Sequence, residues 1–360
     1  MRRRIKEYKR HLFRSLAFWT VSIVLFAIYR YFAIDHEIGI RIDAAYEPIY
    51  HFYQIVWSFG LSGFLLGIVY ASVEYIFDTY LSRKIPLIIN LLVQFVLISL
   101  SVIAISEVVS TFFSSVNRLD FDISPEIWYR NPSSWALFTY IFFASVIFSV
   151  LVISTDRLGR GKLIRMMVGH YLYPRETQRI FMFLDLKSST AIAERLGHYK
   201  YSQLIQDFFY DINELVVPHD AEIYQYIGDE VVLTWPYKKG MKRNSSLRLF
   251  FALQKMITDK SDFYRKKYGL VPEFKAGLHG GALMVTQVGV VKKELAYHGD
   301  VINTTARIQE ACNTYAAHLL ISESLLEKLQ KTRPITSRYI GNVMLKGKEK
   351  EVKIHTVEIN

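Results

Sequence analysis

Residues 180–190 have the sequence IFMFLDLKSST, in which an apolar run interrupted only by Asp185 precedes a polar cluster. A short apolar run that ends in polar residues predicts a buried strand over residues 180–186. The polar cluster then opens a helical stretch over residues 191–196, and a second one follows over residues 201–217. Asp185 therefore stands at the end of a buried strand, where its carboxylate is available for chemistry or for capping the next helix.

The segments that follow complete an α+β pattern. Strands over residues 221–226 and 230–235 flank Ile227-Gly228-Asp229, a combination typical of a hairpin turn. We expect a helix over residues 245–268, then strands over 274–278 and around 283–290. The order strand, helix, two strands, helix, strand is the split βαβ arrangement of ferredoxin-like (βαββαβ) domains.

The chain divides into two unlike halves near residue 155. Of its 360 residues 51% are apolar, and before residue 155 these gather in four stretches long enough to cross a bilayer, which needs roughly 20 helical residues. The stretches are residues 16–33, 53–77, 86–113 and 135–154. The first lacks a small-residue cleavage site, so we interpret it as a span and not as a signal peptide. We expect an α-helical four-span membrane domain over 1–155, a juxtamembrane segment over 156–176 and a cytosolic domain over 177–360.

The net charge of +11 is concentrated beside these spans. Seven basic residues lie before residue 15, where lipid headgroups explain them without nucleic-acid binding. The turn at Arg83-Lys84 and the segment after residue 156 are also basic, whereas the other two connections carry acidic residues. The positive-inside rule then predicts a multi-pass protein of the cell membrane with both termini in the cytoplasm. The single cysteine, Cys312, excludes an internal disulfide and fits a reducing cytosol.

Two features of the membrane half have more than one interpretation. Glu74 and Glu107 fall within or near apolar runs, where an ionisable group suggests sensing or ion binding. Both lie near the predicted end of a span, so we interpret them as structural. Residues 155–174 combine basic residues with an apolar pattern and end at Pro174. This segment is either a helix that transmits a signal or an inert spacer.

Four blocks of the C-terminal half together resemble the motif series of class III adenylate and guanylate cyclases. They are FMFLDLKSST (181–190), YIGDEVV (226–232), YHGDVINTTARIQ (297–309) and LKGKEKEV (345–352). Each block alone is weak, but their order and separation make the resemblance specific from about residue 179 onward. It implies a membrane-anchored enzyme that forms a cyclic nucleotide from a nucleoside triphosphate.

The resemblance assigns roles to individual residues. Asp185, Asp229 and the backbone carbonyl of Leu186 match the ligands of two Mg²⁺ or Mn²⁺ ions, which prefer oxygen donors. Such ions acidify the attacking ribose hydroxyl and neutralise the triphosphate. Taken singly, Asp229 would be an ordinary turn residue beside glycine. Amide groups of the turn at residues 187–190 would meet the phosphates at a helix start.

A second set of residues completes the site implied by the resemblance. Asn303 would orient the ribose, Arg307 would stabilise charge on the α-phosphate, and Lys346 would hold the terminal phosphates, with Lys348 close enough to compete for that role. Asn303 and Arg307 are four residues apart and therefore share one helix face. In this family the aspartates come from one subunit and these three residues from its partner, so we expect a homodimer with two sites.

The base is not determined by the sequence. The two positions that usually select it carry Gln225 and Ala296, which match neither the adenylate nor the guanylate cyclase pattern. A glutamine amide both donates and accepts, so it suits adenine or guanine. Selectivity would then fall to neighbours such as Tyr297 and His298. We favour ATP from the frequency of adenylate cyclases among such chains, and GTP, a pyrimidine triphosphate and a catalytically silent sensor remain open.

Overall fold

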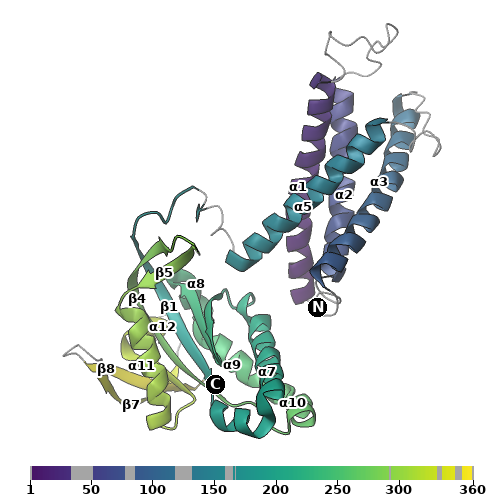
Figure 1. Cartoon of the computed structure of the whole chain (residues 1–360). Helices are drawn as coiled ribbons and strands as arrows, with labels where there is room; N and C mark the ends of the chain where they lie inside the picture. The colour runs from purple at the N-terminus through teal and green to yellow at the C-terminus, as the bar shows by residue number, and fades with distance from the viewer. Residues whose placement is uncertain are drawn as a thin grey trace. The chain divides into compact units, whose positions relative to one another are not determined.

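The computed structural model describes residues 2–33, 52–77, 86–117, 132–158, 165–166, 168–291, 293–330, 335–344 and 351–358. The chain separates into two compact units, Met1–Leu158 and Gly159–Asn360. The first unit is made of helices, and the second is made of helices packed on a sheet (Figure 1).

The described residues of the N-terminal unit include four long helices; the first three run roughly alongside one another, and the last crosses them obliquely (Figure 1). They are α1 (Arg2–Ala33), α2 (Phe52–Ile76), α3 (Leu87–Asn117) and α5 (Pro132–Leu158). Each contains an apolar stretch of at least 18 residues, which is long enough to cross a membrane. Four apolar helices of spanning length are thus confirmed. The connecting segments 34–51, 78–85 and 118–131, which carry the acidic residues and the Arg83-Lys84 turn behind the orientation prediction, lie outside the described residues.

Helix α1 begins at Arg2 and not near residue 16, because the basic residues that precede the apolar stretch continue the helix. It packs closely on α2 at Gly63 and Gly67. A Cβ atom at Gly63 would lie 2.8 Å from the carbonyl oxygen of Trp19, and one at Gly67 would lie 2.9 Å from Cα of Leu16. Small residues let membrane helices approach in this way.

Glu74 joins the same two helices. Its carboxylate lies 3.1 Å from Nδ1 of His11 and 3.5 Å from a guanidinium nitrogen of Arg14. A carboxylate that pairs across a helix contact favours the structural interpretation of this residue. Glu107, in contrast, is exposed on α3.

The C-terminal unit is built on a sheet whose eight described strands have the order β2-β3-β1-β4-β6-β8-β7, with β5 paired to β4. The strands are β1 (Arg175–Leu186), β2 (Glu222–Ile227), β3 (Glu230–Pro236), β4 (Phe274–Val288), β5 (Glu294–His298), β6 (Leu319–Ser322), β7 (Thr336–Met344) and β8 (Glu351–Glu358). Strand β1 is antiparallel to β3 and to β4. The first four strands and their helices form the expected βαββαβ unit, so the predicted fold class is confirmed.

The helices of this unit follow the predicted order, except that the helix predicted over residues 245–268 is two helices, separated at Lys260. They are α7 (Ser189–Val216), α8 (Tyr237–Met241), α9 (Ser245–Asp259), α10 (Ser261–Tyr268), α11 (Asp300–Thr314) and α12 (Glu323–Gln330), with a 3-10 turn at Lys242–Asn244. Gly197 has φ 71° and interrupts α7, where the sequence predicts a break between two helices. The strands predicted over 274–278 and 283–290 are one continuous strand, β4.

Both faces of β1 are buried. Ile180, Met182 and Leu184 belong to a core that includes residues of α7, α9, α10 and α12, whereas Phe181 and Phe183 pack with residues of α11 on the other face. Helices α7 and α11 accordingly lie on opposite sides of the sheet (Figure 1). This double burial explains why the run is continuously apolar and does not alternate.

The segment before β1 is described only in part. Residues 159–164 and 167 lie outside the described residues, and residues 168–171 form a turn. The Tyr171 carbonyl accepts a hydrogen bond of 2.9 Å from the amide of Gln287 on β4. Strand β1 then begins at Arg175, five residues earlier than predicted. The juxtamembrane role of residues 156–176 stays a prediction.

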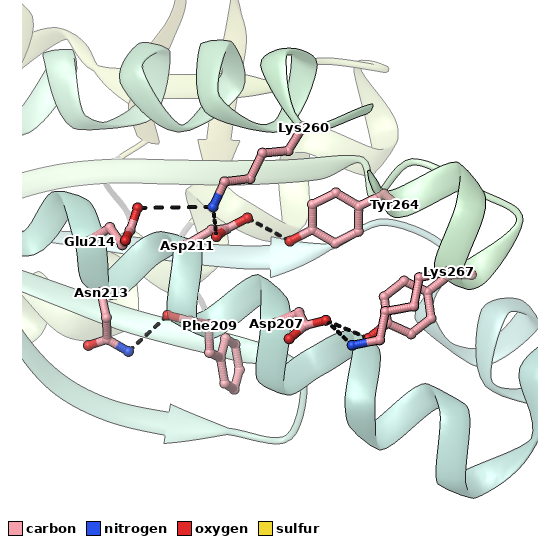
Figure 2. Close-up of polar contacts among 9 residues, drawn as sticks. Asp207, Phe209, Asp211, Asn213, Glu214, Lys260, Tyr264 and Lys267 are labelled. Carbon is pink, nitrogen blue, oxygen red and sulfur yellow. Dashed lines mark hydrogen bonds and ion pairs between the residues drawn. The ribbon is translucent and has the colours of Figure 1, made fainter. Parts of the chain in front are cut away.

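Two acidic residues of α7 tie this helix to the end of α9 and to α10 (Figure 2). Asp211 is almost fully buried and accepts hydrogen bonds from Lys260 Nζ at 2.5 Å and from the Tyr264 hydroxyl at 2.7 Å. Burial and the hydrogen bond to Asp211 raise the pKa of Tyr264, so the hydroxyl stays protonated and donates. One turn earlier, the partly exposed Asp207 accepts from Lys267 and Tyr268, each at 2.7 Å.

Tyr264→Phe is expected to destabilise the C-terminal unit by about 1–3 kcal/mol, because it removes a donor from a buried carboxylate. Urea unfolding of the full chain in detergent micelles, followed by pulse proteolysis of this unit, measures the change. Tyr268→Phe is the matched control and should cost less than about 1 kcal/mol, since water can replace the donor at Asp207. Equal losses in the two variants would contradict the importance of the Asp211 pair.

Candidate active site

Asp185 and Asp229 reach one region from different elements. Asp185 is the penultimate residue of β1 and lies directly opposite Glu230 in the β1–β3 register. Asp229 precedes Glu230 in the turn between β2 and β3, where Gly228 adopts φ 61°. The charge of Asp229 acts on Asp185, which shows that the two carboxylates are neighbours. Two predicted ligands, 44 positions apart in the sequence, therefore come together.

Two residues that the sequence does not single out hold Asp185. Lys275 Nζ lies 3.1 Å from Asp185 Oδ2, and Gln309 Nε2 donates to the same oxygen at 2.9 Å. Lys275 also donates to Asn313 Oδ1 at 2.8 Å, so the lysine links β1, β4 and α11. Its position opposite Asp185 follows from the β1–β4 register, which no local pattern reveals. Gln309, by contrast, is the last residue of the block YHGDVINTTARIQ (297–309), so the sequence does offer a signal for it.

Neighbouring carboxylates raise the pKa of two of these groups, Asp185 and Glu230. Burial, and after it the charge of Asp229, raise the pKa of Asp185, while its hydrogen bond to Lys275 acts in the opposite direction. Burial together with Asp185 and Asp229 raises the pKa of Glu230 to about 7. Three carboxyl groups thus share one partly buried region, and a cation bound there would relieve their repulsion.

The donor chemistry of this region fits a hard divalent cation, because its ligand atoms are carboxylate oxygens. Among the described residues, no group of three or more histidine, cysteine, aspartate or glutamate side chains is arranged to hold a metal ion. In the described part of the chain, Asp185 and Asp229 with a backbone carbonyl such as that of Leu186 are therefore the candidate donor set. One oxygen of Asp185 is already engaged by Lys275 and Gln309.

The turn after β1 leads directly into α7. Ser188 has φ 54°, and the helix begins at Ser189. The amide of Lys187 donates to the Glu273 carbonyl at 2.8 Å, so this amide is used by the fold and is not directed at a ligand. The following amides lie at the start of a long helix, where the helix dipole favours anions.

Asn303 and Arg307 lie on a different face of α11 from Gln309. Gly277 on β4 allows the close contact, because a Cβ atom there would lie 2.4 Å from the Gln309 amide nitrogen and 2.7 Å from the Thr305 carbonyl oxygen. At 100° per residue, the side of the helix that faces the sheet is nearly opposite to that of Asn303 and Arg307. Both side chains are exposed, and Arg307 pairs with Glu310 at 2.5 Å. A single chain thus does not bring Asn303 and Arg307 together with the aspartates. Lys346 and Lys348 lie outside the described residues.

The two positions associated with the base lie on separate strands. Gln225 is exposed on β2 at a register irregularity, and Ala296 is half-buried on β5 opposite Thr286. Their neighbours Tyr224 and Tyr297 make an edge contact at 5.1 Å between ring centroids. Tyr297 is buried and burial raises its pKa to about 12, whereas His298 is exposed. Of Tyr297 and His298, only His298 has a side chain that solvent reaches.

Comparison with known proteins gives a consistent result. A family model described as the adenylate and guanylate cyclase catalytic domain matches residues 173–358. Adenylate cyclase 2 of Rhizobium meliloti (strain 1021) is 32% identical over 199 residues, which cover 55% of this chain and 55% of that protein. Human retinal guanylyl cyclase 2 is 22% identical over 47% of this chain and 15% of its own length. The chain therefore spans about half, or less, of the length of these relatives.

A solved structure also resembles the C-terminal unit. The crystal structure of the adenylyl cyclase CyaB from P. aeruginosa is similar with a TM-score of 0.47 and 18% identity. The match covers 52% of this chain and 97% of that one.

The raised pKa of Glu230 predicts a loss of stability at higher pH. The folded chain holds this proton more tightly than the unfolded chain, so between pH 4.5 and about 7 stability falls as pH rises. The shift corresponds to about 3 kcal/mol, which we reduce to about 1–2 kcal/mol because solvent screens a half-buried group. In metal-free buffer the wild type should lose this much more than Glu230→Gln between pH 5 and pH 8, measured by urea unfolding with pulse proteolysis. The same pH dependence in both proteins would contradict the assignment of this stability change to the Glu230 carboxyl group.

Proposed function

Because residues 173–358 make this chain a member of the adenylate and guanylate cyclase catalytic domain family, we propose that it converts ATP to 3′,5′-cyclic AMP and pyrophosphate. The observation that carries the proposal is the split arrangement of the site residues. Asp185 lies beside Asp229 on one side of α11, whereas Asn303 and Arg307 are exposed on another. The aspartates would hold metal ions, and Asn303 and Arg307 would contact the substrate, so each set needs the other.

The proposed assembly is a homodimer with two shared sites. Asp185, Asp229 and the Leu186 carbonyl would hold divalent cations in one copy, and Asn303, Arg307 and Lys346 would come from the other. A two-fold axis repeats each contact, so one interface builds both sites. Members of this family generally depend on divalent metals, and for this chain we propose two Mg²⁺ or Mn²⁺ ions per site. When bound, these ions lower the pKa of the ribose 3′-hydroxyl and neutralise the triphosphate.

The chain's own residues would direct the reaction. Asn303 would hold the ribose so that its 3′-oxygen faces the α-phosphorus in line with the departing pyrophosphate. Arg307, which is always charged, would donate to the α-phosphate oxygens as their charge grows. Lys346 would hold the pyrophosphate oxygens. Lys275 and Gln309 would keep the Asp185 carboxylate oriented, since both contact its Oδ2.

ATP is favoured over GTP because the relative with 32% identity is an adenylate cyclase. A second relative from the same organism, 26% identical over 49% of this chain, is also named an adenylate cyclase. Gln225 offers hydrogen bonds to either purine. GTP, a pyrimidine triphosphate and a silent nucleotide sensor are therefore outcomes of the test.

We further propose that residues 1–155 anchor the enzyme in the cell membrane, with both termini in the cytoplasm. The four apolar helices and the basic flanking segments support this orientation. Residues 156–176 would connect this anchor to the catalytic domain over 177–360. The division of the chain into two compact units between Leu158 and Gly159 supports these proposed boundaries.

Asp229→Ala should lower cyclic AMP formation by about 100-fold or more, as expected when a group that stabilises the developing charge is lost. The assay measures all four cyclic nucleotides from matched triphosphates with Mn²⁺, using full-length protein in detergent. Asp262→Ala, which removes a fully exposed carboxylate on α10, is the matched control and should keep full activity. Unchanged activity in Asp229→Ala would contradict the mechanism, and a different cyclic nucleotide would correct the substrate.

Mixing two inactive variants tests the shared site. Asp185→Ala and Arg307→Ala should each be inactive alone. In a mixed dimer one site carries both changes and the other carries neither. Random pairing makes half of the dimers mixed, and each has one intact site of two, so co-expression should restore about a quarter of wild-type activity. A mixture as inactive as its components would contradict a site built from two copies.

A further inference from the structure

The turn between β4 and β5 presents apolar side chains to solvent. Strand β4 ends at Val288, and β5 begins at Glu294. Between the two strands, Val290 and Val291 are 92% and 102% exposed. Turns usually carry glycine, asparagine, aspartate or other polar residues, so the requirements of the turn do not explain two consecutive valines. Exposed apolar residues that lie together mark an interaction surface.

The segment that leads from the last apolar helix into the sheet lies beside the end of β4. The Tyr171 carbonyl accepts a hydrogen bond of 2.9 Å from the amide of Gln287, the residue before the end of β4. Val168, Leu172 and Tyr173 of this segment are exposed as well. A second group of exposed apolar residues therefore adjoins the turn at the same end of β4.

The connection between this segment and the last apolar helix is short. Helix α5 ends at Leu158, six residues beyond the end of its apolar stretch at Val152. Val168 follows Leu158 by ten positions, and ten residues span at most about 35 Å when fully extended. A bilayer with its headgroups is roughly 40–45 Å thick. The connection therefore keeps Val168 within one bilayer thickness of the end of α5.

Basic residues predominate around the exposed apolar ones. Residues 159–176 and 288–294 together contain six basic and two acidic residues. Those whose exposure is described are all exposed: Arg165, Arg175, Glu176, Lys293 and Glu294. Apolar side chains beside an excess of positive charge are typical of a surface that binds anionic lipids. A two-fold contact with a second copy would instead bring the same basic residues together, which is unfavourable.

We propose that the turn between β4 and β5 docks on the anionic lipid surface of the bilayer that holds the chain. Val290 and Val291 enter the boundary between headgroups and acyl chains, where interfacial apolar groups lie about 5–10 Å deep. Lys293 binds the phosphate and carboxylate groups of the lipids. Leu172 and Tyr173 add apolar surface beside the turn. This contact depends on the membrane anchoring proposed above for residues 1–155.

Fluorescence of the full-length protein in lipid nanodiscs tests the contact, with the environment-sensitive dye NBD attached to Val291→Cys. Cys312 does not compete for the dye, because it is 1% exposed and burial raises its pKa to about 12. In discs that contain phosphatidylserine, the dye should emit at a shorter wavelength than in water. Lipids that carry a spin label near the headgroup should quench it.

Lys293→Glu should reduce the ratio of docked to undocked chains about fivefold or more, as measured from the quenched fraction of the dye. The reason is that each basic residue near an anionic surface favours binding. Discs of phosphatidylcholine alone should reduce the quenched fraction of the wild-type turn in the same direction. Lys255→Glu is the matched control, because it reverses the charge of an exposed lysine on α9, and it should leave the quenching at residue 291 unchanged.

A second control and a prior measurement separate the possible outcomes. The dye attached to Asp262→Cys, a fully exposed position on α10, should remain in water. Co-elution of protein and lipid is measured first, and a chain that does not enter nanodiscs would overturn the anchoring and this contact together. In chains that have entered the bilayer, three results overturn the contact alone. They are a dye at residue 291 that stays in water, a dye that is shifted but not quenched by labelled lipid, as burial against a second copy would give, and equal quenching with and without Lys293→Glu.

Discussion

The close contact between α11 and β4 at Gly277 determines the geometry of the C-terminal unit's site. The Gln309 amide nitrogen and the Thr305 carbonyl oxygen occupy the space where any side chain at residue 277 would begin. A helix held this near to a sheet cannot roll without a steric clash. Its sheet-facing side is therefore set, and with it the direction of every other side chain on α11.

That orientation has opposite consequences for residues only two positions apart. Gln309 reaches Asp185, whereas Arg307 is exposed and pairs with Glu310 on the surface of the helix. One helix thus contributes to the carboxylate region of its own chain and presents a separate polar face to solvent. The proposal of a site shared between two copies rests on this division.

The carboxylate region itself is a balance of charges. Asp185, Asp229 and Glu230 repel one another in a partly buried place, and Lys275 offsets part of that repulsion. The net field favours a cation over an anion, even before a substrate is considered. The lysine also anchors Asp185 to β4 and, through Asn313, to the end of α11. Lys275 therefore both offsets the negative charge of this region and holds Asp185 in position.

The sequence by itself determined the features that depend on neighbouring residues. The buried strand around residues 180–186, the hairpin turn at Asp229, the break at Gly197 and four apolar helices all follow from local periodicity and turn chemistry. Residues in such patterns lie within one helical turn or one strand of each other. The tertiary structure alone decided the pairing of Asp185 with Lys275 and the two separate faces of α11. These features join segments far apart in the chain, and only strand register and helix packing, which no local pattern encodes, bring their atoms together.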